Sequence, residues 1–280
     1  MNLIQGSQEW LDARKSFVTG TDSAVVMQLS PWESPYSLWR KKMDLDPPQV
    51  QTAIMARGNE LEPIAREWLQ KENQIECSPI VITKDFMMAS LDGLSPCETF
   101  IVEIKCGEKS YKEAQQGRIA DYYRCQMFHQ MHCANVAYGL YVAFNGQDGI
   151  VIKVERDDDF IKEMIERERE FYQCLIQFTP PTMTTRDYLQ RSDPKWIELA
   201  ERYQKAHQSL KESESIELEL RNELIALAGS QSSQGAGIKL SKVPRKGNVE
   251  YSRIPSLQGV DLDVYRKPSI EYWKLQVENV

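Results

Sequence analysis

The residues with the clearest chemical potential are two acidic motifs in the first half of this 280-residue chain. Asp92 ends one apolar run, and Glu103 and Lys105 lie within the next. Alternate residues of a strand point to the same side, so Glu103 and Lys105 share one face while Val102 and Ile104 point into apolar core. A turn between the two strands lets Asp92 lie beside Glu103. The spacing therefore predicts two carboxylates and one ammonium in a partly buried place.

Two carboxylates this close repel each other unless a cation neutralises them. Oxygen-only ligation suits Mg²⁺ or Mn²⁺, which makes a metal-dependent nuclease one interpretation. The other is a surface salt bridge between Glu103 and Lys105 on an edge strand. Upstream, Glu62 lies beside the apolar stripe of an amphipathic helix. It is either a third metal-facing carboxylate or a solvated helix charge.

The elements that must position these side chains are visible as a change of hydrophobic period. Helical spacing predicts a helix and a second short helix over 7–28, then helices over 34–43 and 52–72. A period of two follows and predicts strands at 80–82, 86–91 and 100–104. Next come a helix over 113–134, strands at 137–144 and 149–154 joined by an Asn145-Gly146 turn, and a helix over 157–178.

The sequence predicts three parts: a core over 1–179, a helical extension over 180–228 and a tail over 229–280. Thr179-Pro180-Pro181-Thr182 marks the first boundary. Apolar residues near heptad positions, interrupted at Ser213 and Glu217, predict one long helix or a helical hairpin over 194–228 and a packing or oligomer face. Residues 229–237 are expected to be flexible. Residues 238–251 are expected to form a basic β-hairpin whose turn holds Arg245-Lys246-Gly247-Asn248, either contacting phosphates or simply solvated.

Composition excludes several classes of protein. No apolar run approaches the roughly 20 residues of a membrane span, and the first residues do not form a signal peptide, so a cytoplasmic protein is expected. The six cysteines include no C-x-x-C pair, which argues against a zinc ribbon. His129 and His132 lack a third soft ligand and are expected to be packing or surface residues. The net charge of −7 argues at first against nucleic acid, but residues 229–280 are net basic, at +3.

Five ordered motifs together resemble the YqaJ-type viral recombinases, the phage lambda exonuclease family within the PD-(D/E)xK nuclease superfamily. The resemblance covers about residues 5–178 of the chain. The motifs are Trp10-x-x-x-Arg14 with Thr19-Gly20-Thr21, Arg57-Gly58-x-x-x-Glu62-x-x-Ala65-Arg66, Leu91-Asp92-Gly93, Glu103-Ile104-Lys105-Cys106 and Tyr123-x-x-Gln126. Two positions depart from the familiar form: Leu91 replaces a Pro, and Phe128 stands where a second polar residue often follows the Gln.

The resemblance implies an α/β fold, with a restriction-endonuclease-like core of central mixed sheet flanked by helices and a C-terminal helical and β-hairpin extension. It implies that Glu62, Asp92, Glu103 and the carbonyl of Ile104 ligate two Mg²⁺ ions, with Mn²⁺ as a substitute. Lys105 would orient and help deprotonate the attacking water, or stabilise transition-state charge, and Gln126 would hold the substrate or a metal-bound water. Arg14 and Thr21 would bind a 5′-terminal phosphate. The competing interpretations are a helix-surface ion pair for Arg14 and a helix cap for Thr21.

The implied function is a Mg²⁺-dependent 5′→3′ exonuclease for phage-type recombination, in a bacterial or phage-infected cell. It would digest the 5′-ended strand of linear double-stranded DNA with a 5′ phosphate and leave a 3′ single strand for an annealing protein. Relatives are ring-shaped trimers, so a homo-oligomer is expected. Two alternatives stay open: a structure- or sequence-specific endonuclease of the same fold, and a non-catalytic binding or assembly protein. Intact Asp92, Glu103 and Lys105 argue against the second.

Overall fold

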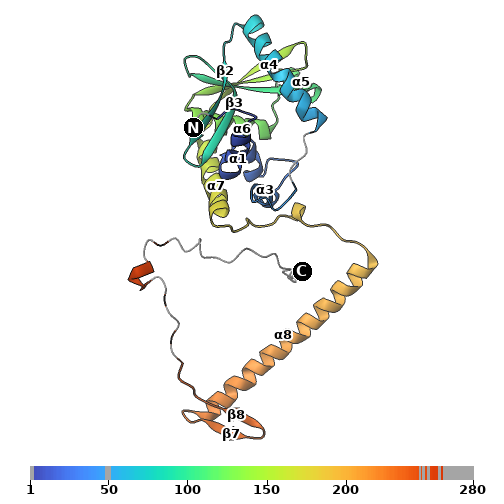
Figure 1. Ribbon diagram of the computed structural model, residues 1–280. Coiled ribbons are helices and arrows are strands. Elements are labelled where there is room, and N and C mark those ends of the chain that lie inside the picture. Colours follow the sequence, from blue (N-terminus) through green and yellow to red (C-terminus); the bar gives the residue numbers. More distant parts are fainter. Residues whose placement is uncertain are drawn as a thin grey trace. The chain divides into compact units, whose positions relative to one another are not determined.

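The computed structural model describes residues 3–47, 52–245, 247, 250, 253–257 and 260. The chain forms two compact units, residues 1–189 and residues 190–280. Figure 1 shows the first unit as a sheet with its helices and the second as one long helix followed by a short hairpin. Each unit is described by itself.

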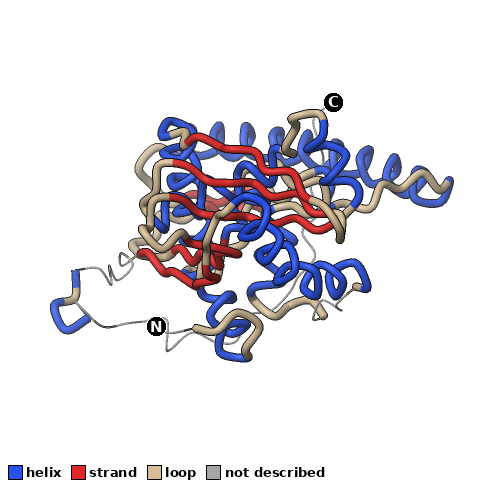
Figure 2. The backbone as a smooth tube through the Cα atoms, turned by 90° about the horizontal axis from the view of Figure 1, so that it is seen from above, coloured by secondary structure: helices blue, strands red, loops and turns tan. Residues whose placement is uncertain are grey.

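A six-stranded mixed sheet forms the centre of the first unit (Figure 2). Its strands are β1 (Val18–Thr19), β2 (Ser78–Lys84), β3 (Met87–Leu94), β4 (Phe100–Cys106), β5 (Tyr138–Phe144) and β6 (Gly149–Glu155). The order is β1-β3-β4-β5-β6, with β2 also paired to β3. The β4–β5 and β1–β3 pairs are parallel, and the β2–β3, β3–β4 and β5–β6 pairs are antiparallel. The predicted core strands are therefore all present.

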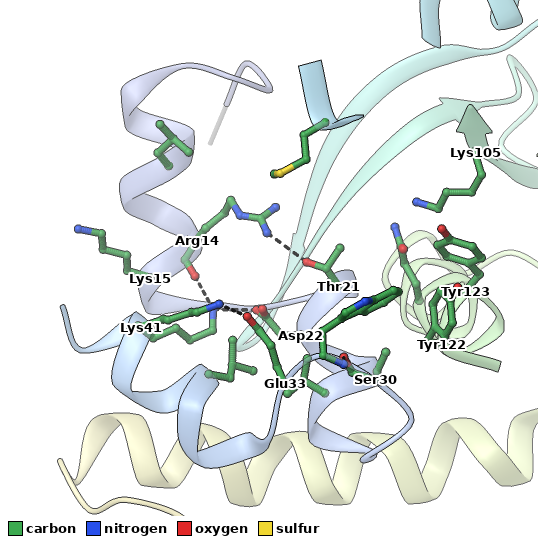
Figure 3. Close-up of a pocket in the computed structure, with 18 residues that line it drawn as sticks. Arg14, Lys15, Thr21, Asp22, Ser30, Glu33, Lys41, Lys105, Tyr122 and Tyr123 are labelled. Atoms are coloured by element: carbon green, nitrogen blue, oxygen red, sulfur yellow. Dashed lines mark hydrogen bonds and ion pairs between the residues drawn. The ribbon is translucent and has the colours of Figure 1, made fainter. Parts of the chain in front are cut away.

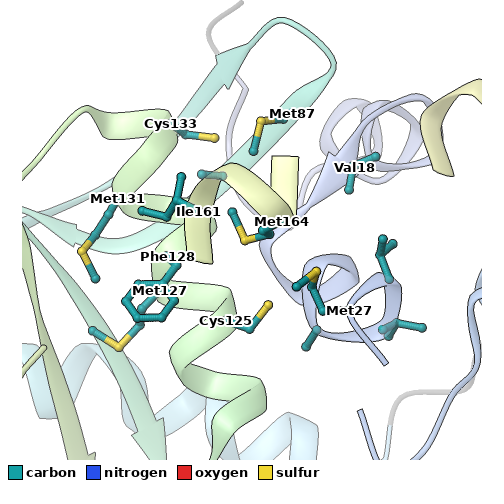
Figure 4. Packing of buried hydrophobic residues seen from close by; sticks show 14 of the residues in the cluster. Val18, Met27, Met87, Cys125, Met127, Phe128, Met131, Cys133, Ile161 and Met164 are labelled. Carbon is teal, nitrogen blue, oxygen red and sulfur yellow. The ribbon is translucent and has the colours of Figure 1, made fainter. Parts of the chain in front are cut away.

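Helices cover both faces of this sheet, and two apolar clusters hold them there. The helices are α1 (Gln8–Ser16), α2 (Gly20–Val26), α3 (Pro35–Lys42), α4 (Ala53–Asn73), α5 (Glu108–Gln115), α6 (Asp121–Ala134) and α7 (Asp158–Ile176). On one face Ala65 and Leu69 of α4 pack on Val102 and Ile104. On the other face α2, α6 and α7 pack together, and Met127 of α6 lies among their buried side chains (Figure 4).

One predicted core element is wrong. A single helix was expected over 113–134, but the chain forms α5 and α6 with a break between them. Gly117 lies in that break with a φ of 69°, a left-handed conformation that glycine adopts at little cost and that ends a helix. The break allows α6 to run in its own direction across β3 and β4.

The first unit extends past the predicted boundary at residue 179. The segment after α7 returns to the core through a short 3₁₀ turn, η1 (Thr185–Asp187). Arg186 donates a hydrogen bond to the Ser30 carbonyl at 2.7 Å, and Asp187 accepts one from Ser34. These bonds explain why the division between the units falls after Leu189.

The second unit consists of α8 (Pro194–Ala228), β7 (Ser233–Gly235), β8 (Ile238–Leu240) and the turn η3 (Pro255–Leu257). Of the two forms predicted for 194–228, the single helix is present. The hairpin lies earlier than expected, since β7 falls in the segment predicted to be flexible. Ala236 and Gly237 both have positive φ, which suits a two-residue hairpin turn. The expected turn at 245–248 includes Lys246 and Asn248, which lie outside the described residues.

Within the described residues, no helix combines the length and apolar character that crossing a bilayer demands.

Gly93, beside the predicted catalytic Asp92, is required by close packing. A Cβ at this position would lie 2.5 Å from the Sγ of Cys77 and 3.1 Å from the Cβ of Val102. We expect Gly93→Ala to lower the free energy of unfolding by about 1–3 kcal/mol, because the overpacked strand must shift. The matched control is Gly58→Ala in α4, where no atom lies within 4 Å and a small stabilisation is expected. Urea denaturation of both variants checks this, and equal effects would contradict it.

Candidate active site

Strand β4 carries the chemistry that its sequence pattern predicted. Val102 and Ile104 point into the cluster beneath α4, and Glu103 and Lys105 point to the opposite face, toward α6. The parallel pairing of β4 with β5 buries β4 inside the sheet rather than at an edge. The interpretation of Glu103 and Lys105 as an exposed salt bridge on an edge strand is therefore wrong, since Glu103 is only 1% exposed.

Three side chains contact the buried carboxylate of Glu103, two by hydrogen bonds and one as an ion pair. Gln126 donates a hydrogen bond from Nε2 to Oε1 at 2.7 Å, and Gln130 donates from Nε2 to Oε2 at 2.5 Å. Lys105 forms an ion pair with the same carboxylate. Glu103 and Gln126, two of the predicted site residues, thus meet directly between β4 and α6.

Sequence reasoning missed Gln130. The position noted there for a second polar residue is Phe128, whose side chain packs in the core against Phe160, with ring centroids 5.2 Å apart. The available signal was the spacing of Gln126 and Gln130, because residues four apart lie on the same side of a helix. Gln130 is 1% exposed, and its Oε1 atom has no hydrogen-bond partner within the described part of the chain.

Asp92 lies beside Glu103, as predicted. Its Oδ2 accepts a hydrogen bond from the Ile104 amide at 2.7 Å across the β3–β4 pair. Burial raises the pKa of Asp92 well above its usual range, and the nearby Glu103 carboxylate raises it further. Lys105 and the Ile104 amide oppose this rise only in part.

Glu62 of α4 belongs to the same electrostatic group. Its Oε1 lies 2.6 Å from the guanidinium of Arg66, and Arg66 also donates to the backbone carbonyl of Asp92 at 2.9 Å. Burial raises the pKa of Glu62; Arg66 opposes this, and repulsion from Glu103 adds to it. Of the two interpretations of Glu62, the solvated helix charge does not fit, because the side chain is only 22% exposed and its charge interacts with that of Glu103.

The donor chemistry of this group fits a hard divalent cation. Glu62, Asp92 and Glu103 supply only oxygen, and the repulsion that raises the pKa values of Glu62 and Asp92 would be relieved by a cation. Over the described residues, however, no three Asp, Glu, His or Cys side chains are already grouped so as to hold one ion. Both oxygens of Glu103 accept bonds from the amides of Gln126 and Gln130.

Lys105 remains a cation in this environment. Burial alone would lower the pKa of its ammonium, but Glu103 and Asp92 outweigh that effect and raise the pKa above its usual value. The ammonium also lies 4.8 Å from the ring centroid of Tyr123 in a cation–π contact. A lysine held in this way supplies positive charge rather than a free base.

The residues predicted to bind phosphate reach the same place as Lys105. A cavity of about 550 Å³ is lined by Arg14, Thr21, Lys105 and Gln126 among others (Figure 3). Arg14 donates from Nη2 to the Oγ1 of Thr21 at 3.1 Å, and its guanidinium stacks on Trp10 at 4.7 Å. Thr21 is not a helix cap, since Thr19 is the N-cap of α2.

An aromatic ladder borders this cavity. Trp32 is 70% exposed, whereas Trp39 is buried. The ring of Trp32 meets Tyr122 edge-on at 5.0 Å, and Tyr122 meets Tyr123 at 4.4 Å. An exposed aromatic ring thus lines the same cavity as Arg14 and Lys105.

Behind the site, α6 is fixed by a fully buried pair. His129 Nδ1 lies 2.9 Å from Glu168 Oε1 of α7, and its Nε2 lies 3.2 Å from the carbonyl of Met88. Burial alone would lower the pKa of His129, but the Glu168 carboxylate outweighs it and raises that pKa well above its usual value. The expected packing role of His129 is confirmed, and it is one residue from Gln130.

Comparison with known proteins gives a family match for the part of the chain that holds this arrangement. Residues 9–137, which hold all of these candidate residues except Glu168, match the model of the YqaJ-like viral recombinase domain. The chain is 26% identical over 185 residues to the uncharacterized protein YqaJ of Bacillus subtilis, across 61% of this chain and 57% of that protein. The chain therefore spans little more than half of this curated relative.

Solved structures show the same fold. The alkaline exonuclease LHK-Exo of Laribacter hongkongensis aligns with a TM-score of 0.55 and 27% identity, over 62% of this chain and 94% of that one. A complex of LHK-Exo with dAMP aligns equally well at 26% identity. The chain has the PD-(D/E)xK fold predicted from its motifs, with a helical and hairpin extension, and its similarity to an alkaline exonuclease supports a nuclease.

Asp92→Asn tests the acidic cluster without relying on activity. The folded pKa of Asp92 lies above its unfolded value of about 3.9, so the ionised side chain costs stability at any pH above that value. We expect the variant to be more stable than the wild type in EDTA at pH 8, with the difference disappearing below about pH 4.

Chemical denaturation across that pH range measures the difference. Glu170→Gln, which removes an exposed carboxylate of α7, is the matched control and should show no such pH-dependent gain. If Asp92→Asn were less stable than the wild type at pH 8, the inferred repulsion between Asp92 and the neighbouring carboxylates would be contradicted.

Proposed function

We propose that this protein is a Mg²⁺-dependent 5′→3′ exonuclease that digests the 5′-ended strand of linear double-stranded DNA and leaves a 3′ single strand. One observation carries the proposal: Arg14 and Thr21 line the same cavity as Lys105 and Gln126. A terminal phosphate held by the first pair would lie close to the group that carries out cleavage. The similarity to an alkaline exonuclease supports the same reaction class.

The acidic cluster is the proposed metal site. Glu62, Asp92, Glu103 and the Ile104 carbonyl would hold Mg²⁺, as two ions, with Mn²⁺ able to replace them. Bound there, the metal would polarise the phosphodiester and lower the pKa of a coordinated water. Gln126 and Gln130 hold the Glu103 carboxylate in a fixed orientation by hydrogen bonds, and Lys105 supplies the opposite charge.

Lys105 is proposed to stabilise the transition state. Because Glu103 and Asp92 raise its pKa, its ammonium stays protonated and contributes positive charge to the phosphate that is being attacked. This favours the charge-stabilising role over proton removal from water. Gln126 lines the cavity as well as contacting Glu103, and it is placed to hold the substrate.

Capture of the 5′ phosphate would make the enzyme depend on DNA ends. Arg14 offers a planar guanidinium and Thr21 a hydroxyl donor, a combination suited to phosphate. Holding the end fixes which phosphodiester reaches Lys105. The exposed ring of Trp32 at the cavity rim is positioned to stack on a base near that end. A ring trimer, an annealing protein as partner and a cytoplasmic location are further parts of this proposal.

The second candidate is a structure- or sequence-specific endonuclease with the same catalytic group. For the proposed exonuclease, we expect digestion of linear duplex DNA with Mg²⁺, no digestion in EDTA and no cutting of covalently closed circular duplex. Lys105→Ala should lower the rate by about 100-fold or more, since it removes preorganised charge from the reacting phosphate. Cutting of the closed circle would favour the endonuclease, and an unchanged rate for Lys105→Ala would refute this active site.

Arg14→Ala tests the end-binding role separately. On 5′-phosphorylated duplex, the rate should fall about 10- to 100-fold, the effect of losing a hydrogen bond to a charged group. On duplex with a 5′-hydroxyl end, Arg14→Ala should digest the DNA at about the rate that the wild type shows on the same substrate. Arg167→Ala is the matched control, because this arginine forms an exposed ion pair with Glu163 on α7. Equal losses on both ends would place Arg14 in general DNA binding.

A further inference from the structure

Helix α8 has a heptad stripe that the described residues of its own unit leave exposed. Positions a and d fall on Trp196, Leu199, Tyr203, Ala206, Leu210, Ser213, Glu217, Leu220, Leu224 and Leu227. None of the residues of α8 is buried. Leu199, Leu210 and Leu220 are each more than half exposed. An exposed apolar stripe of this length is typical of a surface that binds a partner.

We propose that α8 pairs with α8 of a second copy of this chain in an antiparallel two-helix coiled coil. In the proposed ring trimer, this two-fold contact would join chains of different rings. The charge distribution along the helix favours this partner. Residues 194–211 carry four basic and two acidic side chains, whereas residues 212–228 carry one basic and five acidic ones. A second copy in the opposite direction places each basic half against an acidic half. A parallel pair would place the two acidic halves together.

The two interruptions of the stripe select the register. When Leu224 faces Leu199 of the second copy, Leu220 faces Tyr203 and Leu227 faces Trp196. Glu217 then faces the small Ala206 in the basic half, and Ser213 faces Leu210. Flanking positions also match, because Arg202 comes near Glu223 of the second copy. A parallel pair would instead bring two Glu217 carboxylates together in the interface, which is unfavourable.

The C-terminal end of α8 lines a cleft that accommodates Trp196 of the second copy. Leu224, Leu227 and Ala228 form an apolar cleft with Ile238 and Leu240 of the hairpin strand β8, with a volume of about 340 Å³. Leu224 and Leu227 belong both to this cleft and to the stripe. In the antiparallel register, the half-exposed Trp196 of the second copy lies at this cleft. The two-fold symmetry forms two identical contacts, one at each end of the helix pair.

Disulfide trapping in the full chain tests both partner and direction. The background is Cys97→Ser, because Cys97 is the exposed native cysteine. A mixture of Leu199→Cys and Leu224→Cys chains should form a mixed disulfide dimer. Leu224→Cys alone should not link to itself, since the two sites would be roughly 38 Å apart along the antiparallel axis. Self-linking of Leu224→Cys would overturn the antiparallel arrangement.

Sedimentation of the full chain provides a second measurement. Combined Leu199→Glu and Leu220→Glu should lower the mass of the particle by a factor of two or more. Trp196→Ala should weaken the association of the two copies at least about tenfold, as expected for an aromatic side chain that fills a cleft at an interface. Leu218→Glu lies off the stripe and is the matched control, with no change expected. The proposal fails if these substitutions leave the mass of the particle unchanged and no mixed disulfide forms. Binding of α8 only to a different protein would also contradict it.

Discussion

The Glu103 carboxylate is buried within the sheet, and a buried charge is costly unless its surroundings neutralise it. The core depends on meeting this constraint. Lys105 supplies the opposite charge from the same strand, and Gln126 and Gln130 supply amide donors from α6. Asp92 on the neighbouring strand adds repulsion that these donors do not remove. The site is thus a place where folding tolerates unfavourable electrostatics, which is common where function requires it.

The need to hold α6 in register explains features distant from the site. Small residues of α2 allow a close approach, since a Cβ at Gly20 would lie 3.3 Å from the side chain of Gln126. On the far side, the buried His129–Glu168 pair ties α6 to α7, and His129 also contacts the backbone of β3. Donors fixed in this way need little rearrangement when charge develops in the reaction.

Local patterns in the sequence predicted the strands, most helix bounds and the placement of Asp92 beside Glu103. Period and spacing suffice there, because alternation alone decides which face of β4 a residue occupies. They fail where tertiary packing decides. Phe128 packs in the core, and Gln130, one turn after Gln126, makes the second amide contact with Glu103. The exposure of Trp32 could not be predicted either, because an aromatic residue gives no local signal of its final exposure.

The parallel pairing of β4 with β5 has a consequence for how the candidate site forms during folding. Parallel neighbours cannot be joined by a tight turn, and here the connection contains α5 and α6. The amides of Gln126 and Gln130 therefore reach Glu103 only when this crossover closes and β5 joins the sheet. A nascent chain that has made β4 but not α6 holds a Glu103 carboxylate with Lys105 as its one partner from this group. Assembly of the candidate site is thereby tied to completion of the fold.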